Sequence, residues 1–410
     1  MCLGKYTNGV WITISTMLVW IDMMDVGLGN GLRNKLAAYM AHDDYHNARI
    51  VITSTFGMLM AIMLPIMACL LILIENADVA GFLNVDTTLV PDVIPALEAA
   101  VLLIGGSFVF KFIGNLYMGL QLPAVSTLIT TLGQTLSVVL TAVAYYCGWH
   151  SLLAISIVTT ASPLIVWLVA YPLTFYVRYP QLRPQRTMFR FESVRELFTL
   201  GAQFFVIQIC GMLLLMSSGI LISKWFSPEY VTPYNIAYRY CSIVLLIFTV
   251  ICSPFWSATT DAYERRDWQW LRKAGHTMDR LLLLLMLLMC IMVLVSPWIY
   301  YLWINKWQHE EIEIPMMMTA LMALYQMILI VSLRYSNFLN GFGALRLQVY
   351  TIVVASLLLV PLGWVLTRFV PNVNGLLLTL CAVNVPGLII NYVQYKKIMR
   401  NTATGFWRVR

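Results

Sequence analysis

Charged residues are scarce in this chain. Only 11% of its 410 residues are Asp, Glu, Lys or Arg, whereas 60% are hydrophobic, and the mean hydropathy is +0.78. This balance excludes a water-soluble globular protein with an ordinary charged surface. The first residues also lack the basic segment and small-residue cleavage site of a secretory signal, so we expect no processed leader.

Patterns typical of metal sites, disulfide frameworks and hydrolytic centres are missing as well. The eight Cys are scattered without paired spacing, and the five His all fall in predicted loops. We therefore expect neither an enzyme nor a bound metal or cofactor. The net charge of +7 gathers beside the ends of apolar runs, where Lys and Arg meet lipid headgroups, so nucleic acid is not an expected partner but membrane lipids are.

The chain instead has about eleven apolar stretches, and each is long enough to cross a bilayer. A helix needs about 20 residues to span a hydrocarbon core of roughly 30 Å. Continuous runs such as 281–295 do not show the alternation of a transmembrane β-strand. The predicted fold is an all-α polytopic membrane protein with spans at 7–24, 50–75, 97–120, 124–147, 152–177, 198–223, 234–256, 278–304, 315–339, 346–367 and 373–395.

Lys and Arg concentrate in every second gap between the spans. The gap 178–196 holds five Arg, whereas 76–96 has no Lys or Arg, so the basic gaps and the basic tail are predicted to be cytoplasmic. Eleven crossings then place the N-terminus outside. We expect that one further helix preceded Met1 and was lost by truncation or by a misplaced start, which would give twelve spans with both ends inside.

The basic gap at 178–196 also predicts a division of the chain. It separates an N-terminal bundle, 1–177, from a C-terminal bundle, 197–410, which carries the basic tail. A weak internal repeat favours this division, since AYMAHDDYHNAR (38–49) resembles AYERRDWQWLR (262–272). Parallel repeats of this kind are related by an axis along the membrane normal.

A glycine-rich segment, VGLGNG, follows the first span at 26–31. Alternating glycines propagate a helix poorly, so we expect the backbone to open here, as irregular backbone does where it lines a wet cavity. The alternative is an ordinary cytoplasmic turn with solvated charges. Asp22 and Asp25 lie beside it and are candidates for coupling to a proton or a sodium ion, although acids at helix ends are more often simply solvated.

Three cations fall within predicted spans. Lys111 lies deep in its span, with Asn115 on the same helical face, whereas Arg239 and Arg334 lie nearer the interfaces. A cation at such depth normally faces a protein interior or an aqueous cavity. The alternative for each is a side chain that snorkels to the interface. Because unpaired buried charge is costly and few acids lie nearby, these cations suggest an anionic ligand.

Several strings together resemble one transporter family: DVGLGNGLRNKLA (25–37), VTPYNIAYRY (231–240), SPFWSATTDAYERRDWQWLRK (253–273) and SNFLNGFGALRLQVY (336–350). They look like the polysaccharide flippases of the multidrug/oligosaccharidyl-lipid/polysaccharide exporter superfamily, in particular the Wzx-type transporters of O-antigen or capsule repeat units. The resemblance implies two six-helix lobes with pseudo-twofold symmetry around a central cavity. It also implies transport of an undecaprenyl pyrophosphate-linked oligosaccharide from the cytoplasmic to the periplasmic leaflet of the inner membrane.

The resemblance also implies substrate-binding positions beyond the three cations. By position in the family's motifs they are Asp25, Asn30, Arg33, Asn34, Asn337 and Asn340, with Gly341 beside the last of them. Two departures stand out, since the family's first helix is absent and the segment 216–223 lacks an expected acidic or amide residue.

Three other functions stay open at this point. A cation-coupled drug exporter of the same superfamily should favour acidic cavity residues. A polysaccharide polymerase or ligase should carry a large outer loop with catalytic Arg or His, and none is found in the sequence. A lipid-binding assembly scaffold would need no transport at all.

Overall fold

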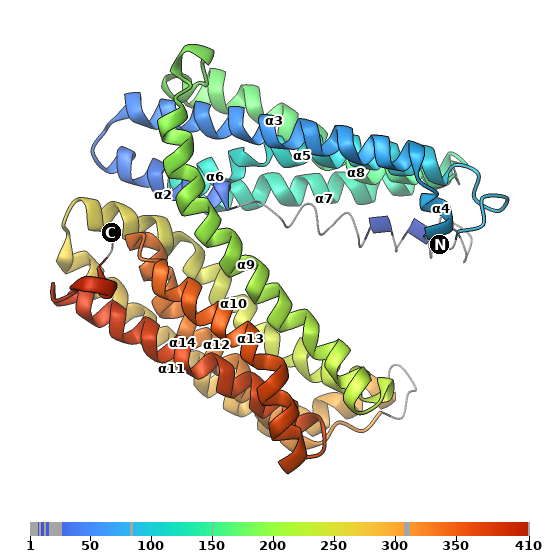
Figure 1. The fold of residues 1–410 in the computed structure, drawn as a ribbon, viewed down its shortest axis with the longest axis vertical. Coiled ribbons are helices and arrows are strands. Elements are labelled where there is room, and N and C mark those ends of the chain that lie inside the picture. The colour runs from blue at the N-terminus through green and yellow to red at the C-terminus, as the bar shows by residue number, and fades with distance from the viewer. Residues whose placement is uncertain are drawn as a thin grey trace. The chain divides into compact units, whose positions relative to one another are not determined.

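The structure, a computed structural model, describes residues 7, 10–11, 14–15, 27–82, 85–149, 151–306 and 312–408 (Figure 1). Within these residues the chain is helical and contains no strand. Most of the first predicted span, together with Asp22 and Asp25, lies outside the described residues.

The chain divides into two compact units, residues 1–202 and residues 203–410. In the first unit α5 packs against α3 and α8, α7 packs against α8, and α6 packs against α2. Its helices are α2 (Leu28–Ala41), α3 (Tyr45–Asn76), α4 (Val79–Phe82), α5 (Val93–Phe110), α6 (Phe112–Gly119), α7 (Pro123–Tyr146), α8 (Leu152–Pro172) with a π-helical extension (Leu173–Arg178), and the beginning of α9 (Phe191–Trp225).

The second unit contains the rest of α9 and five further helices. Its α12 packs against α10, α11 and α14, and α13 packs against α14. These helices are α10 (Val231–Glu264), α11 (Trp268–Tyr300) with a π-helical extension (Tyr301–Lys306), α12 (Met316–Phe342), α13 (Arg346–Phe369) and α14 (Val373–Met399).

Ten helical segments of the described chain are long and apolar enough to cross a membrane. They correspond one to one with the second to eleventh predicted spans, and α5 and α6 together form one of them. The prediction of an all-α multi-pass membrane protein is therefore confirmed. Several helices continue past the apolar run that predicted them. For example, α10 ends only at Glu264 and α11 begins at Trp268.

The segment at 178–196 is attached to the first unit. It forms two short 3₁₀ turns before α9 begins. Arg49 on α3 donates from Nε to the carbonyl oxygen of Arg183 at 2.7 Å, and the backbone N–H of Arg190 donates to Ser54 Oγ at 3.2 Å. The backbone of this segment is thus held by α3 through hydrogen bonds. Its role as the boundary between two bundles stays a prediction.

The weak sequence repeat corresponds to a repeated local structure. After α2 and after α10, one residue adopts a positive φ, Asp43 at 55° and Arg266 at 58°. The next residue, Asp44 or Asp267, caps the following helix by accepting a hydrogen bond from the backbone N–H three residues on, at 3.0 and 2.9 Å. Hydrogen bonds from the backbone and side chain of Asn47 lower the pKa of the Asp44 carboxyl, which favours the charged cap.

A second repeat lies at the ends of α6 and α12. Asn115 and Gly119 recur as Asn337 and Gly341, and in each case a residue with positive φ follows two positions later, at 60° and 74°. Asn115 and Asn337 are separated by nearly the same number of residues as the two capping aspartates, Asp44 and Asp267. The two units therefore repeat the same order of helices and of the turns between them, as the predicted pseudo-symmetric fold requires.

Candidate functional site

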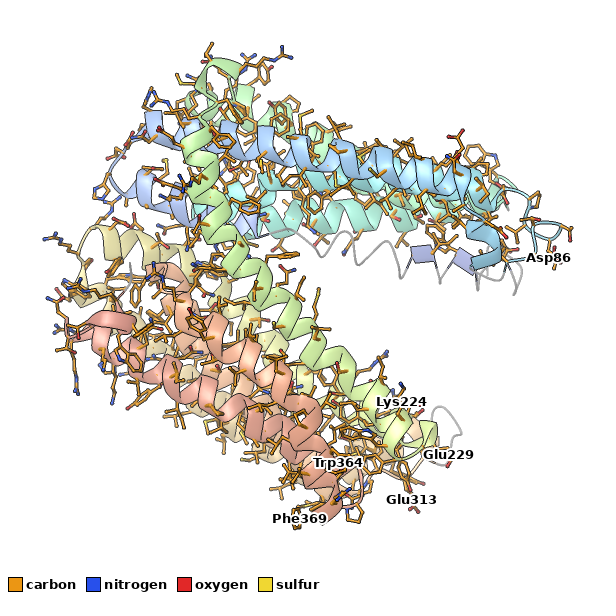
Figure 2. The ribbon with its side chains drawn as sticks, in the orientation of Figure 1. Asp86, Lys224, Glu229, Glu313, Trp364 and Phe369 are labelled. Carbon is orange, nitrogen blue, oxygen red and sulfur yellow. The ribbon has the colours of Figure 1, made fainter. Side chains whose placement is uncertain are left out.

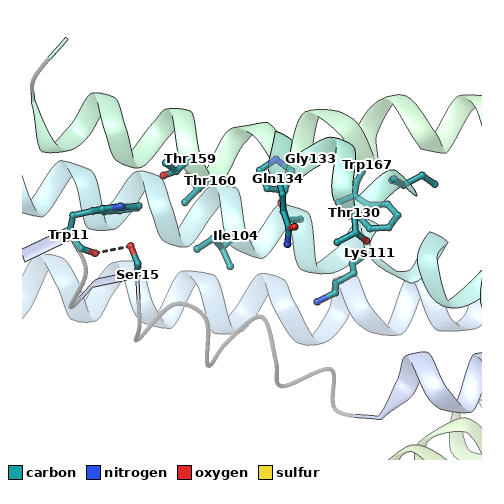
Figure 3. A pocket seen from close by; sticks show the side chains of 13 residues that line it. Trp11, Ser15, Ile104, Lys111, Thr130, Gly133, Gln134, Thr159, Thr160 and Trp167 are labelled. Atoms are coloured by element: carbon teal, nitrogen blue, oxygen red, sulfur yellow. Dashed lines mark hydrogen bonds between the residues drawn. The ribbon is translucent and has the colours of Figure 1, made fainter. Parts of the chain in front are cut away.

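A cavity of about 270 Å³ lies among the helices of the first unit (Figure 3). Its lining combines hydroxyl groups, one amide, one amine and two indoles. The described residues that line it include no carboxylate. They are Trp11, Ser15, Ile104, Ser107, Lys111, Ile129, Thr130, Gly133, Gln134, Thr159, Thr160, Pro163 and Trp167.

Lys111 reaches this cavity from a break in the helix. It is the single residue between α5 and α6, within the span Val93–Gly119. Its backbone N–H still bonds to the carbonyl oxygen of Ser107, and its own carbonyl accepts from the N–H of Gly114, both at 2.9 Å. The backbone N–H and carbonyl groups of Lys111 are therefore both hydrogen-bonded at the break, as membrane-embedded backbone requires. Ser107 lies one turn earlier on the same face, and its buried hydroxyl has no hydrogen-bond partner among the described residues.

The opposite wall is built where α7 and α8 approach closely. A β-carbon at Gly133 would lie 3.1 Å from Cα of Pro163, so a larger residue would push these helices apart. Trp167 follows one turn after Pro163, and its side chain is buried at 5% exposure. Gly133 thus allows α8 to place Trp167 against the cavity.

The hydroxyl groups of the lining bond to their own helices. Ser15, Thr130, Thr159 and Thr160 each donate to the carbonyl oxygen four residues earlier, at 2.7, 3.0, 2.7 and 2.6 Å. A hydroxyl has one donor and two acceptor lone pairs. Because the donors are used, these four groups offer mainly acceptors to a ligand.

The structure separates the three predicted cations. Lys111 lines the cavity of the first unit, whereas Arg239 and Arg334 belong to the second unit. Arg239 is exposed on α10, and its carbonyl oxygen accepts a hydrogen bond from Ser242 at 2.9 Å. Of the three, therefore, only Lys111 lies in the cavity described here.

Arg334 has a counter-ion that the sequence analysis did not identify. Its side chain is only 3% exposed, and Nη2 lies 2.8 Å from Oδ1 of Asp279 on α11, whose side chain is 48% exposed. Nη2 also donates to the carbonyl oxygen of Gly275 at 3.2 Å. The guanidinium carbon lies 4.3 Å from the ring centre of Tyr335 and 4.6 Å from that of Tyr395. Arg334 is therefore paired and stacked, and it does not snorkel away from the bundle.

The first unit places aromatic rings at the positions equivalent to this ion pair. Phe56 follows Asp44 by the same interval as Asp279 follows Asp267, and Phe112 precedes Asn115 as Arg334 precedes Asn337. The rings of Phe56 and Phe112 are 5.1 Å apart. At this position the first unit thus has a contact between two aromatic rings, whereas the second unit has an ion pair.

The glycine-rich segment makes a close helix contact. Gly27 has φ 68° just before α2, and a β-carbon there would overlap the carbonyl oxygen of Gly201 on α9. A β-carbon at Gly31 would lie 3.3 Å from the carbonyl oxygen of Leu197. Lys35 pairs with Glu196 along the same contact. Gly29 and Gly31 are helical, so within the described part of this segment the backbone departs from the helix only at Gly27.

The remaining predicted site residues lie on three helices. On α2, Arg33 and Asn34 are buried and Asn30 is half-buried. Arg33 Nη1 lies 3.6 Å from the sulfur of Met118, so the Arg33 side chain packs against α6. The others, Asn115 on α6 and Asn337 and Asn340 on α12, are half-buried and are not among the residues that line the cavity. No group of three or more potential metal ligands occurs in the described part of the chain.

Comparison with known proteins decides the family. A family model described as polysaccharide biosynthesis protein matches residues 9–257, which is more than half of the chain. The chain belongs to the polysaccharide biosynthesis protein family. A second model, MatE, matches residues 204–365 of this family member. The predicted likeness to the multidrug/oligosaccharidyl-lipid/polysaccharide exporter superfamily is thereby confirmed, and the chain is a membrane transporter of that superfamily.

A curated relative is the putative O-antigen transporter of Salmonella typhi. It is 20% identical over 275 residues, which cover 66% of this chain and 61% of that relative. The match therefore spans less than two thirds of the relative's length.

Solved structures share the fold at low identity. A MATE transporter in its bent conformation superposes with a TM-score of 0.81 at 14% identity, covering 98% of this chain and 90% of that one. An outward-facing multidrug resistance MATE transporter gives 0.79 at 15%, and a superfamily transporter from Pyrococcus furiosus gives 0.75 at 14%. Each of these two covers 98% of this chain and 89% of its own.

Proposed function

We propose that this transporter is a flippase for lipid-linked oligosaccharides. It moves an oligosaccharide on an undecaprenyl pyrophosphate carrier from the cytoplasmic to the periplasmic leaflet of the bacterial inner membrane, with its C-terminus in the cytoplasm. The observation that carries the proposal is the cavity within a membrane-spanning bundle, lined by Lys111, hydroxyl groups and indoles and by no carboxylate among the described residues. The match to the polysaccharide biosynthesis family and the O-antigen relative support the same substrate class.

The physical problem that such a flippase solves is desolvation. A sugar hydroxyl moved from water to hydrocarbon without a partner costs several kcal/mol, on the order of 4–8 kcal/mol in the least polar reference solvent. A polar cavity inside the bundle replaces those hydrogen bonds while the polyprenyl tail stays in lipid. We propose that the two units give alternating access to this path, in the manner of transporters built from repeats.

The cations have different roles in this proposal. Lys111 attracts the anionic part of the cargo, because an amine offers charge-assisted hydrogen bonds. Arg239, Asn30, Arg33, Asn34, Asn115, Asn337 and Asn340 remain proposed substrate contacts. Arg334 is already held by Asp279 and two rings, so it contributes to binding only when that pair opens. The coupling ion, a proton or sodium, and the roles of Asp22 and Asp25 remain predictions.

The test is transport by the purified protein in liposomes. A fluorescently labelled polyprenyl pyrophosphate oligosaccharide is placed in one leaflet, and its appearance in the other is followed with a quencher or a lectin. We expect the Lys111→Met variant to lose most transport while inserting normally. Lys224, exposed near the end of α9, provides the matched control Lys224→Met (Figure 2). Normal transport by Lys111→Met would refute the role of Lys111, and no transport by the unaltered protein would refute the flippase.

A cation-coupled drug exporter is the second candidate, and the MatE match and the MATE structures favour it. The cavity argues against it, because Lys111 repels cationic drugs and the described lining offers no carboxylate to attract them. The same liposomes decide between the two. A proton or sodium gradient that drives efflux of a cationic dye, without movement of the lipid-linked sugar, would establish the exporter.

A further inference from the structure

Two basic segments occupy equivalent places in the two units. The first basic segment, 178–190, begins at the end of the π-helical extension of α8, and the second, 396–408, begins in the last turn of α14. We propose that both segments bind the headgroups of anionic phospholipids and anchor their units at the membrane surface that is predicted to be cytoplasmic. This inference does not depend on the proposed cargo. Four properties carry it: charge, repetition, a fixed backbone and exposed rings.

Both segments carry only positive charge. Neither contains Asp or Glu. Their cations are Arg178, Arg183, Arg186 and Arg190 in the first segment and Lys396, Lys397, Arg400 and Arg408 in the second. Within the described part of the chain, none of these side chains forms an ion pair. Their charges are therefore available to the phosphate groups of an anionic membrane surface.

The two segments repeat one pattern of basic residues. Arg178 and Arg400 are separated by the same number of residues as the repeated Asn of α6 and α12, and so are Arg186 and Arg408. Each segment also contains a 3₁₀ turn. The basic pattern thus belongs to the repeated unit and is not a feature of a single loop.

Hydrogen bonds and packing fix the backbone of the first basic segment. Besides its two hydrogen bonds with α3 described above, the backbone N–H of Gln185 donates to Thr53 Oγ1 at 3.2 Å. Both 3₁₀ turns of the segment pack against α3. The guanidinium carbon of Arg183 lies 4.2 Å from the ring centre of Tyr176. Because these attachments already order the segment, its Arg side chains lose less conformational entropy when they bind a phosphate.

The second basic segment folds back against its own helix. The backbone N–H of Thr402 donates to the carbonyl oxygen of Lys397 at 2.9 Å, and Asn401 turns the chain with a positive φ of 56°. The 3₁₀ turn Gly405–Trp407 packs against α14 (Figure 1). Nζ of Lys397 lies 4.2 Å from the ring centre of Trp407. A cation and an aromatic ring are thus held together in this segment, as in the first.

An exposed phenylalanine accompanies each segment. Phe191, directly after the first segment, is 74% exposed, and Phe406 in the second is 81% exposed. Apolar rings beside Lys and Arg are typical of interfacial anchors, in which the rings enter the boundary between headgroups and acyl chains while the cations bind phosphates. Since both segments follow membrane-spanning helices, that boundary lies within their reach.

The use of Arg in the first segment indicates recognition of phosphate. All four of its cations are Arg and none is Lys. Either residue would orient a membrane span, but only the planar guanidinium binds two phosphate oxygens side by side. We therefore expect the first segment to discriminate more strongly than the second, which includes two Lys, between a phosphate headgroup and other anions.

Lipid binding is measured by native mass spectrometry of the purified full-length protein. The probes are phosphatidylglycerol and phosphatidylcholine with identical acyl chains. The double variant Arg186→Gln with Arg190→Gln should weaken one class of tight phosphatidylglycerol site roughly 20-fold, because each basic residue near an anionic surface contributes about fivefold. Arg400→Gln with Arg408→Gln should do the same at a second class of site. Binding of phosphatidylcholine should not change in either variant.

The matched control removes two other exposed cations. Lys224 and Arg368 lie near the ends of α9 and α13, and Arg368 also lies over a ring, that of Trp364. Lys224→Gln with Arg368→Gln should keep the tight phosphatidylglycerol sites. Equal losses in this control and in the segment variants, or no preference of the unaltered protein for phosphatidylglycerol, would overturn the inference. Full retention in Arg186→Lys with Arg190→Lys would overturn the argument from Arg.

The occupant of the exposed rings is identified in membranes. A photoreactive benzoylphenylalanine replaces Phe191 or Phe406 in the full chain, and the products formed on illumination are separated by mass. Crosslinks to phospholipid support the anchor at that segment. Crosslinks only to protein, whether to a second copy, to a different protein or to another part of this chain, would overturn it.

Discussion

Removing the carboxylate of Asp279 should destabilise the second unit. In Asp279→Asn the guanidinium of Arg334 stays buried at 3% exposure but loses its ion-pair partner at 2.8 Å. Nε and Nη1 of Arg334 already lack hydrogen-bond partners among the described residues. Nη2 is therefore the nitrogen that loses its charged partner. An unpaired buried charge is the costly outcome of breaking such a pair.

The magnitude follows from the exposure of the two partners. Breaking a fully buried pair costs about 3–5 kcal/mol, and an exposed pair is worth about 0–1 kcal/mol. Asp279 is 48% exposed, so the pair lies between these limits and we expect a loss of about 2 kcal/mol. For a unit of this size, 1 kcal/mol shifts Tm by about 2–4 °C. Asp279→Asn should therefore lower Tm by about 4–8 °C.

The measurement is thermal unfolding of the detergent-solubilised protein at one fixed scan rate. The matched control is Asp261→Asn, which breaks the exposed pair between Asp261 and Arg265 at 3.0 Å in the same unit. This pair joins residues four apart on one helix, and such pairs are worth about 0.3–0.5 kcal/mol, so we expect a shift of about 1–2 °C for this control. The double variant Asp279→Asn with Arg334→Met removes the stranded charge and should recover part of the loss. Equal shifts for Asp279→Asn and Asp261→Asn would refute the reasoning.

The other stability predictions concern backbone geometry and helix caps. Gly27→Ala should lower the free energy of unfolding by several kcal/mol, because its β-carbon would overlap the backbone of α9. Gly405 also has a positive φ but lies in open space, so Gly405→Ala should lower it by only about 1 kcal/mol. Unfolding scans of both variants measure the difference. Asp44→Ala and Asp267→Ala should each lower the free energy of unfolding by about 0.5–2 kcal/mol, because each removes a helix cap. Hydrogen exchange should become faster at the start of α3 in the first variant and of α11 in the second. Unchanged exchange in either variant would contradict the capping role.

The helices could be predicted from the sequence because long apolar runs report the thickness of the bilayer directly. Ten predicted spans therefore have their counterparts in the structure. The same argument placed Lys111 deep in a span and required an interior or aqueous environment for it, and the side chain lines a cavity. Its position at a helix break was not predictable, since the apolar run continues without interruption through α5 and α6.

The partners of the cations could not be read in the same way. Asp279 stands at the beginning of its predicted span, where an acid is normally solvated, and helical periodicity within α11 says nothing about which residue of α12 faces it. The glycine segment also has a long-range cause, because Gly27 is required by the backbone of Gly201, far away in the chain. Pairings between helices depend on tertiary packing, whereas the sequence pattern reports each helix alone. The available signal was the sequence repeat, in which Asp279 and Arg334 stand at the positions equivalent to Phe56 and Phe112.

Because the two units repeat the same turns and helix caps, each unit can be compared position by position with the other. Phe56 with Phe112 and Asp279 with Arg334 are two answers to one packing problem on the same backbone pattern. Exchanging them would place an ion pair where the first unit has two rings, and two rings where the second unit has an ion pair. Each unit therefore shows how the same local backbone pattern packs when the other kind of side-chain pair is present.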